Sequence, residues 1–254
     1  MILLLDIGNT STKFSFFDLK KGRLNKPISV LTYSGSTITK IIKYIKSKKI
    51  KFVLASSVVP KIYNSIKKKL LIKKIKTFEF KDRQIKKFIK ININKKSQVG
   101  SDRILNAIGS SNLYKKNCII VDFGTTTTFD IVDKNKIYQG GVIAPGINLS
   151  LKALNRFTAK LPLINIFKQK KVIGKDTRSA INSGVFIGYS CLINGIIKKI
   201  KQQSKKKYLV VLTGGYAKLF EKCITFKTII NKDITLQGLA LTVKDNKEVF
   251  SEKY

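Results

Sequence analysis

Several residue types are missing or scarce in this chain of 254 residues, and each gap narrows the chemistry available to it. There is no histidine and no tryptophan, and there are only one methionine and four prolines. Without histidine, general acid–base chemistry falls to carboxylates, lysine, tyrosine or cysteine. The three cysteines, Cys118, Cys191 and Cys223, lack metal-like spacing and predict free thiols in a reducing cytoplasm.

Acidic residues are also few, 14 against 51 basic ones, so the formal net charge is +37. Only five of the basic residues are arginine, and the lysines are spread over nearly every segment rather than gathered in one stripe. We interpret this as a compositional bias on a solvated surface and expect no specific nucleic-acid partner. Non-specific attraction to polyanions at low salt still follows from the field of the whole molecule.

The sequence shows no signal for export or membrane insertion. Residues 1–5 are apolar but lack a basic start and are followed at once by Asp6, so they predict a strand rather than a signal peptide. No uninterrupted apolar run approaches the roughly 20 residues that span a bilayer. The glycine-rich signatures of P-loop and dinucleotide-binding proteins are missing as well. We expect a cytoplasmic protein without a membrane segment.

The most informative pattern that is present occurs twice. An apolar run ends in Asp-Ile-Gly-Asn-Thr at residues 6–10, and a second ends in Asp-Phe-Gly-Thr-Thr at 122–126. A glycine at the tip lets the backbone approach a ligand closely, and the N–H groups of a tight turn form an anion-binding concavity. The Asp at each strand end can hold a cation that neutralises phosphate. Either copy alone is also compatible with a simple Asx turn, but two copies favour phosphate or cation binding.

A second candidate site lies at residues 100–103, which read Gly-Ser-Asp-Arg at the start of a predicted helix. Ser101 is the N-cap candidate of this helix. The helix N-terminus stabilises the Asp102 anion, and the planar donor fork of Arg103 suits a carboxylate or phosphate. The alternative interpretation is that Asp102 only caps the helix and that Arg103 is only a charged neighbour.

Further glycine-containing turns are weaker signals when taken alone. Residues 140–146 form a rigid turn between a strand and a helix, and residues 213–215 read Thr-Gly-Gly after an apolar strand, where a nucleobase could lie on bare backbone. Asp176 or Thr177 can cap the long helix that follows Gly174. Asp130 either joins the cation shell of the second hairpin or merely ends its strand.

The hydrophobic pattern predicts alternating strands and helices, typical of an α/β protein with mixed sheets. Strands are expected over 1–18 as a hairpin, and then over 28–33, 52–56, 75–80, 118–122, 126–132, 136–142, 208–212 and 225–230. Helices are expected over 38–45, 60–71, 101–114, 147–155, 177–199, about 216–223 and 234–244, with a weakly patterned connection over 81–98. The hairpin pattern restarts near residue 118, which indicates two related halves.

These motifs, taken in order, resemble type III pantothenate kinase, a family within the superfamily of acetate and sugar kinases, heat-shock ATPases and actin. The resemblance implies two ribonuclease-H-like α/β halves, 1–115 and 116–254, with mixed sheets flanked by helices and an active-site cleft between them. It also implies transfer of the ATP γ-phosphate to pantothenate, giving 4'-phosphopantothenate in the first step of coenzyme A biosynthesis. The motifs that carry it are 6–10, 100–103, 122–130, 140–146, 158–162, 174–177 and 213–215.

The resemblance implies roles for individual residues. Asp102 is expected to be the general base, and Asp122 to ligate a monovalent cation, potassium or ammonium, while magnesium accompanies ATP. The family works as a homodimer, so a homodimer is expected here. The expected substrate-binding residues are Gly100, Ser101, Asp102, Arg103 and Thr177. The expected ATP-binding residues are Asp6, Ile7, Gly8, Asn9, Thr10, Ser11, Thr12, Lys13 and Thr125.

One position departs from the family pattern. Where the family commonly has a substrate-contacting tyrosine, seven residues before Gly100, this chain has Ile93. Three alternatives to the assignment therefore stay open: another small-molecule kinase of the superfamily, a degenerate ATP-binding relative, and a non-catalytic relative that acts as a transcription accessory or nucleic-acid-binding factor.

Overall fold

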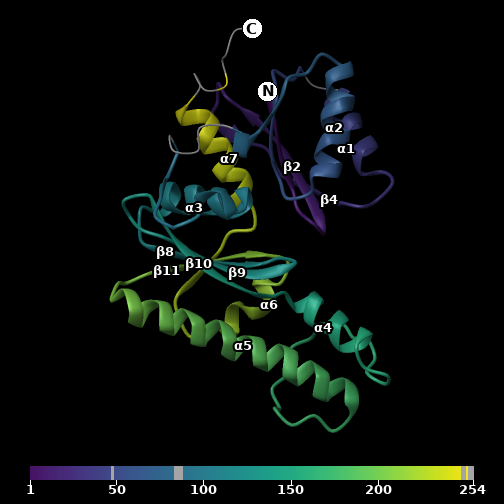
Figure 1. Cartoon of the computed structure of the whole chain (residues 1–254), viewed down its shortest axis with the longest axis vertical. Coiled ribbons are helices and arrows are strands. Elements are labelled where there is room, and N and C mark those ends of the chain that lie inside the picture. Colours follow the sequence, from purple (N-terminus) through teal and green to yellow (C-terminus); the bar gives the residue numbers. More distant parts are fainter. Residues whose placement is uncertain (47–48, 83–87, 247–249, 251–254) are drawn as a thin grey trace. The chain divides into compact units, whose positions relative to one another are not determined.

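The computed structural model describes residues 1–46, 49–82, 88–246 and 250, and it has two six-stranded mixed sheets flanked by helices (Figure 1). The α/β class with two mixed sheets, expected from the sequence, is confirmed. The chain divides into two compact units. Unit 1 comprises Met1–Lys115, Val132–Gly140 and the described residues from Asp233 onward, and unit 2 comprises Lys116–Ile131 and Gly141–Lys232.

The sheet of unit 1 has the strand order β3-β2-β1-β5-β6, with β4 beside β2. The first predicted hairpin forms its centre, because β1 (Ile2–Ile7) pairs antiparallel with β2 (Ser11–Asp18). On its other side β1 pairs in parallel with β5 (Val53–Ser57), whose five residues are all buried. The outer strands are β3 (Arg23–Leu24), β4 (Ile28–Leu31) and β6 (Thr77–Glu79).

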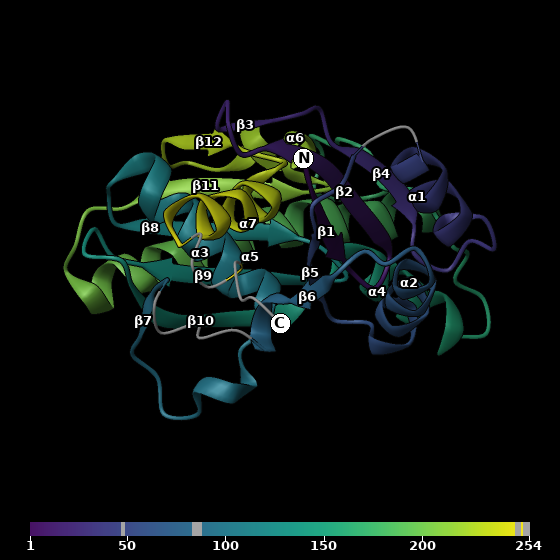
Figure 2. The same cartoon turned by 90° about the horizontal axis from the view of Figure 1, so that it is seen from above.

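Helices cover both faces of this sheet. On one face, Leu3, Leu5 and Ile7 of β1 belong to a core cluster with buried residues of α1 (Thr37–Lys46) and α2 (Pro60–Ile72). On the other face lie α3 (Ser101–Tyr114) and α7 (Ile234–Asp245), which run side by side in both views (Figures 1 and 2). Alternate residues of β1 therefore pack against different helix pairs.

The second sheet has the strand order β12-β11-β8-β9-β10-β7. Its β8 (Cys118–Phe123) and β9 (Thr126–Val132) form the second hairpin, and β11 (Leu209–Gly214) pairs in parallel with β8 as β5 does with β1. The two units thus repeat one arrangement around a strand whose penultimate residue is Asp. The other elements are β10 (Ile137–Pro145), β7 (Lys90–Ile91), β12 (Thr228–Ile230), α4 (Ile147–Arg156) and α6 (Ala217–Phe220).

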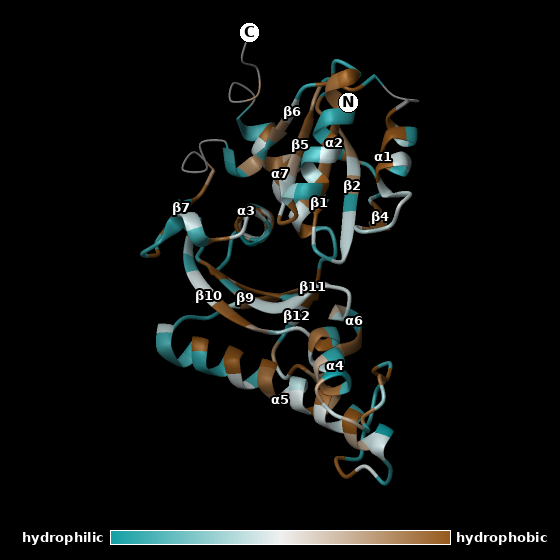
Figure 3. Cartoon of the chain, turned by 45° about the vertical axis from the view of Figure 1, so that its right-hand side comes forward, coloured by the Kyte–Doolittle hydropathy of each residue, from teal (hydrophilic) through white to brown (hydrophobic). Residues whose placement is uncertain are grey.

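The long helix α5 (Thr177–Ser204) runs beneath β8, β9 and β11 (Figure 1). Among the helices in the described part of the chain, it is long and apolar enough to cross a membrane by length and composition alone. Its buried residues, which include Ile181, Val185 and Ile193, belong to the core cluster of unit 2. Hydrophobic and hydrophilic segments alternate along it (Figure 3), as in a helix with one face in a protein core.

Three local expectations differ from the structure. Ser101 is the first residue of α3 rather than its N-cap, because Gly100 occupies the cap and makes no side-chain capping bond. Asp130 does not end its strand, since β9 continues to Val132. The two-residue strands β3 and β7 were not expected, because such short segments carry too little alternation to be recognised in a polar stretch.

Candidate active site

The first hairpin ends in a tight, exposed turn. The N–H of Gly8 donates to the carbonyl of Ser11 at 3.1 Å, and a Cβ on Gly8 would lie 3.1 Å from that same oxygen. A side chain at Gly8 would therefore crowd the turn. Beyond the glycine, Asn9 and Thr10 are exposed, which leaves the tip open to a ligand. This is the geometry that a phosphate-binding backbone turn requires.

Asp6 sits where β1 approaches this tip and is half-buried. Its register partners are Lys13 on β2 and Ser56 on β5. A carboxylate and an ammonium group opposite one another on paired strands attract each other. The first unit therefore presents one acidic and one basic residue side by side at the base of the turn.

The turn at residues 100–103 is tied to the same end of the sheet. The buried hydroxyls of Ser56 and Ser101 share a hydrogen bond, with an Oγ–Oγ distance of 2.9 Å. Because Ser56 is the register partner of Asp6, this bond connects the first hairpin with the start of α3. Ser56 was missed by the sequence analysis, although a pair of serines ending an otherwise apolar strand was a usable signal.

Asp102 lies in the first turn of α3, and its Oδ1 accepts a hydrogen bond of 2.8 Å from the N–H of Arg103. Burial raises the pKa of the Asp102 carboxyl above its ordinary value of 3.8, against the opposing effects of that hydrogen bond and of the Arg103 charge. A Cβ on Gly100 would lie 2.4 Å from Oδ1, so a side chain there would displace the Asp102 carboxylate from this position. A carboxyl group with a raised pKa is better matched to proton transfer near neutral pH.

In unit 2 three predicted motifs meet with their backbones in contact. A Cβ on Gly146 would lie 2.0 Å from the carbonyl oxygen of Thr125, and one on Gly214 would lie 2.5 Å from that of Phe123. Gly214 also has a φ of +84°, which favours glycine. The N–H of Gly215 donates to the Phe123 carbonyl at 3.1 Å. The second hairpin, the Pro145–Gly146 turn and the Thr213–Gly215 turn therefore form one cluster.

Asp122 is the penultimate residue of β8 at this cluster, half-buried and in register with Thr213 on β11. Asp130 lies inside β9, fully buried, and its carboxylate accepts a hydrogen bond of 3.2 Å from the Thr128 hydroxyl. Thr125 is exposed at the hairpin tip. Asp122 and its register partner Thr213 bring a carboxylate and a hydroxyl, both oxygen donors, to this cluster.

This donor set can be tested against the metals that the sequence resemblance implies. Within the described residues, no group of three His, Cys, Asp or Glu side chains could hold a metal ion by itself. Magnesium in nucleotide sites is usually held by one or two carboxylates together with substrate phosphates, so single carboxylates such as Asp6 and Asp122 fit it. A carboxylate such as that of Asp122 also fits a monovalent cation, which takes oxygen ligands.

Thr177 is the first residue of α5 and is exposed. Asp176 caps the helix: its Oδ1 accepts the N–H of Ser179 at 2.9 Å, and these hydrogen bonds lower the pKa of the Asp176 carboxyl. A Cβ on Gly174 would lie 2.3 Å from the backbone nitrogen of Ala180, so the chain folds back tightly just before the helix. The capping prediction for Asp176 is confirmed, and Thr177 lies exposed beside this capped helix start.

Ile93, the departure from the family pattern, follows the short strand β7. The neighbouring Asn92 fixes the chain at this point. The backbone N–H of Asn92 donates to the Tyr138 carbonyl at 2.9 Å, and the side-chain amide of Asn92 donates to the side-chain oxygen of Gln139 at 3.0 Å. A methyl carbon of Ile93 lies 3.4 Å from where a Cβ on Gly140 would be. The substituted position thus lies beside the 140–146 motif, against bare glycine backbone.

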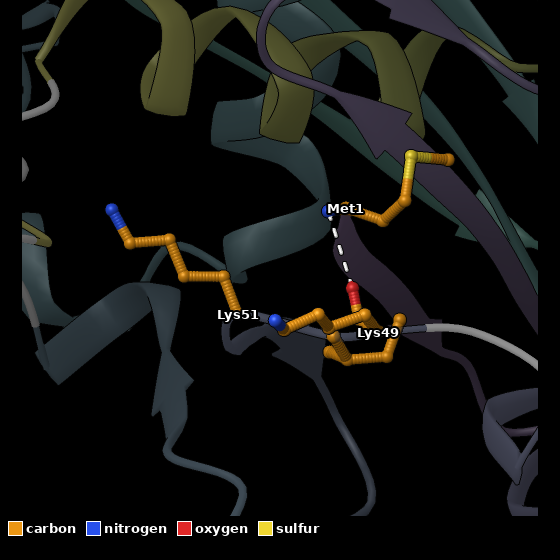
Figure 4. Close-up of a pocket in the computed structure, with 4 residues that line it drawn as sticks. Met1, Lys49 and Lys51 are labelled. Carbon is orange, nitrogen blue, oxygen red and sulfur yellow. Dashed lines mark hydrogen bonds between the residues drawn. The ribbon is translucent and has the colours of Figure 1, made fainter.

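One surface hollow lies apart from these residues. It is lined by Met1, Lys49, Ile50 and Lys51, and the amino terminus donates to the Lys49 carbonyl at 3.4 Å (Figure 4). Met1 precedes the end of β1 opposite to Asp6. The hollow holds no acid, base or nucleophile with an assigned role, and we give it no part in catalysis.

Comparison with solved structures places the fold among known ones. The chain matches the activator of 2-hydroxyisocaproyl-CoA dehydratase from Clostridium difficile, solved with bound ADPNP, with a TM-score of 0.59 over 100% of this chain and 98% of that one. At 13% identity this likeness shows the fold alone. The fold is that of actin-like ATPases and sugar kinases.

Comparison with known sequences then gives the family. The family model for type III pantothenate kinase matches residues 2–199. The type III pantothenate kinase of Pelagibacter ubique is 44% identical, covering 94% of this chain and 97% of that protein. The enzyme of the same name from a Sulfurihydrogenibium species is 36% identical, covering 94% and 98%. The chain belongs to the type III pantothenate kinase family.

Proposed function

We propose that this protein phosphorylates pantothenate with ATP, giving 4'-phosphopantothenate and ADP in the first step of coenzyme A biosynthesis. The family match over residues 2–199 supports the reaction. The observation in the structure that carries it is Asp102, a carboxyl group with a raised pKa at a helix start, in a turn anchored to the Asp6 end of the sheet. The turns at 100–103 and 174–177 argue against the alternative of another kinase of the superfamily.

The chemistry assigned to Asp102 is proton acceptance. As the terminal hydroxyl oxygen of pantothenate forms its bond to the γ-phosphorus, the bond from that phosphorus to the bridging oxygen breaks and ADP leaves. Asp102 takes the hydroxyl proton. Gly100, Ser101 and Arg103 hold the substrate in this proposal, and the guanidinium of Arg103 attracts the pantothenate carboxylate. Phosphoryl transfer otherwise depends mainly on positioning and charge neutralisation.

ATP and cations are assigned to the two hairpins. The tip and flanks of the first hairpin, residues 6–13, contact phosphate, and Thr125 of the second hairpin contacts ATP. Magnesium enters with the nucleotide and neutralises phosphate charge when bound. Asp122 ligates potassium or ammonium in this proposal, and Thr177 contacts pantothenate. The exposed glycine turn and the Asp122 carboxylate in register with Thr213 support these assignments.

We also propose a homodimer in the cytoplasm, built from ribonuclease-H-like halves at 1–115 and 116–254. An apolar stretch between α4 and α5 supports self-association, because Phe157 and Ile173 are 80% and 74% exposed. Three free thiols suit a reducing compartment. Burial raises the pKa of the Cys118 thiol to about 12, which makes it unreactive.

The test is ADP release by the purified protein with ATP, magnesium, potassium and pantothenate, repeated with sodium in place of potassium. Asp102→Asn should lower turnover by about 10²–10⁴, the usual effect of losing an acid–base group, and leave ATP affinity nearly unchanged. Asp18→Asn is the matched control, because Asp18 accepts only the N–H groups of Lys20 and Lys21 at the far end of β2. Near-normal turnover in the Asp102 variant would remove this residue from the mechanism.

A further inference from the structure

Thr32 makes three hydrogen bonds to the first hairpin around its tip, although its partners lie 20 to 24 residues away in sequence. It follows β4 and is fully buried. Its hydroxyl donates to the carbonyl of Gly8 at 2.6 Å, and its Oγ1 lies 3.0 Å from that of Thr12. Its N–H donates to the carbonyl of Thr10 at 3.0 Å.

The direction of these bonds can be deduced. A hydroxyl group has one hydrogen, and that of Thr32 is used toward Gly8, so the Thr12 hydroxyl must donate to Thr32. The result is a relay from Thr12 through Thr32 to the Gly8 carbonyl. Both ends of the exposed turn are thereby fixed by one buried side chain, while its backbone fixes the middle at Thr10.

Fixing these carbonyls also fixes the neighbouring N–H groups. In a planar trans peptide, the C=O of one residue and the N–H of the next point in opposite directions. Thr32 holds the carbonyls of Gly8 and Thr10 toward itself, so the N–H groups of Asn9 and Ser11 are aimed away from β4. Preorganised N–H donors of this kind bind an anion without first having to reorient.

Thr32 is itself held in place. The N–H of Thr37 donates to the Ser34 carbonyl at 3.0 Å, and the Thr37 hydroxyl donates to the carbonyl of Leu31. Thr37 is the first residue of α1 and is buried. The start of this helix therefore fixes the backbone that carries Thr32.

We propose that Thr32 is a positioning residue for the nucleotide phosphates. It holds the first hairpin so that its N–H groups face the phosphate chain, and it touches neither substrate nor nucleotide itself. This inference rests on the proposed function of the hairpin in ATP binding. If Thr32 only satisfied buried polar atoms, its substitution would lower stability and leave phosphate recognition unchanged. If Thr32 positions the hairpin, its substitution weakens phosphate recognition.

The experiment compares the affinities of ATP and adenosine by calorimetry in the full chain. Thr32→Val keeps the shape of the side chain and removes both hydroxyl bonds; it should weaken ATP binding about tenfold and leave adenosine binding unchanged. Thr32→Ser restores the hydroxyl and should bind ATP within about twofold of the original protein. If the valine variant does not fold, Thr32→Cys, a weaker donor of similar size, replaces it and should fall between the two.

Ser15→Ala is the matched control, since the buried Ser15 hydroxyl also donates to a backbone carbonyl, that of Asn25 at 2.7 Å, away from the tip. Ser15→Ala should lower the melting temperature and leave the ratio of the ATP affinity to the adenosine affinity unchanged. A valine variant that is destabilised but keeps that ratio overturns the proposal, as does an original protein that binds ATP no better than adenosine. A further outcome is that the original protein binds ATP better than adenosine, loses this preference in the valine variant, and yet does not phosphorylate pantothenate. That result would support the positioning role of Thr32 and reject the proposed function.

Discussion

At the scale of single residues, Asp102 shows how burial sets the chemistry of a carboxyl group. Removal from water disfavours the anion, whereas the Arg103 N–H and guanidinium favour it, and burial is the larger effect on the pKa. Asp18, which is half-buried, and Asp176, which is exposed, show the opposite balance, because each accepts backbone N–H groups that lower its pKa. The pKa values of these three aspartates thus shift in different directions because their surroundings in the fold differ.

This balance predicts a pH-dependent effect on stability. Because folding raises the Asp102 pKa above 3.8, ionisation of Asp102 costs folding free energy as the pH rises through the raised value. Asp102→Asn removes that charge and should raise the melting temperature at pH 7, a gain that shrinks as the pH falls toward 3.8. Thermal unfolding at several pH values measures it. Asp18→Asn should give no gain at pH 7, since folding lowers the Asp18 pKa.

At the scale of elements, the α3–α7 pair depends on two glycines. A Cβ on Gly238 of α7 would lie 2.2 Å from the carbonyl of Leu105, and one on Gly109 of α3 would lie 2.7 Å from that of Ile234. The Thr235 hydroxyl donates to Asn106 at 2.7 Å across the same contact. The absence of side chains at the two glycines lets the helices approach closely enough to form that bond. This helix pair carries Asp102 at its beginning.

Alanine at Gly238 should therefore be strongly unfavourable. The added methyl group meets backbone that cannot move without separating the helices, and overpacking of this kind costs about 1–3 kcal/mol or more. Chemical denaturation of Gly238→Ala measures the loss. Gly195→Ala in α5 is the control, because a Cβ there meets nothing within 4 Å and alanine should stabilise the helix by about 0.5–1 kcal/mol. Equal effects at the two sites would contradict the close packing of α3 and α7.

At the scale of the whole molecule, the question is whether the net charge of +37 serves specific nucleic-acid binding. A surface covered with lysine attracts DNA through counterion release, so the logarithm of affinity should fall linearly with the logarithm of salt concentration. We expect duplexes of unrelated sequence to bind alike at low salt and to dissociate at physiological salt. A fluorescence anisotropy titration checks this. Binding of one sequence that survives moderate salt would favour the transcription-factor alternative instead.

The proposed homodimer is also tested at this scale. Ile173→Asp places a charge in the exposed apolar stretch before α5 and should convert particles of twice 28.6 kDa into single chains in light-scattering measurements. Leu71→Asp is the matched control, because Leu71 is 72% exposed at the end of α2 in unit 1. A chain that is already single before substitution would contradict the dimer.

The sequence alone determined the fold class, the two hairpins and the family, because each depends on local patterns. Apolar runs that end in Asp-x-Gly specify strands and tight turns without knowledge of distant residues. Only the tertiary structure identified Thr32 and Ser56, which act through hydrogen bonds to residues 20 to 45 positions away. Sequence periodicity reports burial but not partners, and a buried serine or threonine looks the same whether it supports a site or fills a core. The raised pKa of Asp102 was likewise decided by packing, since it depends on how completely the folded chain excludes water from one carboxyl group.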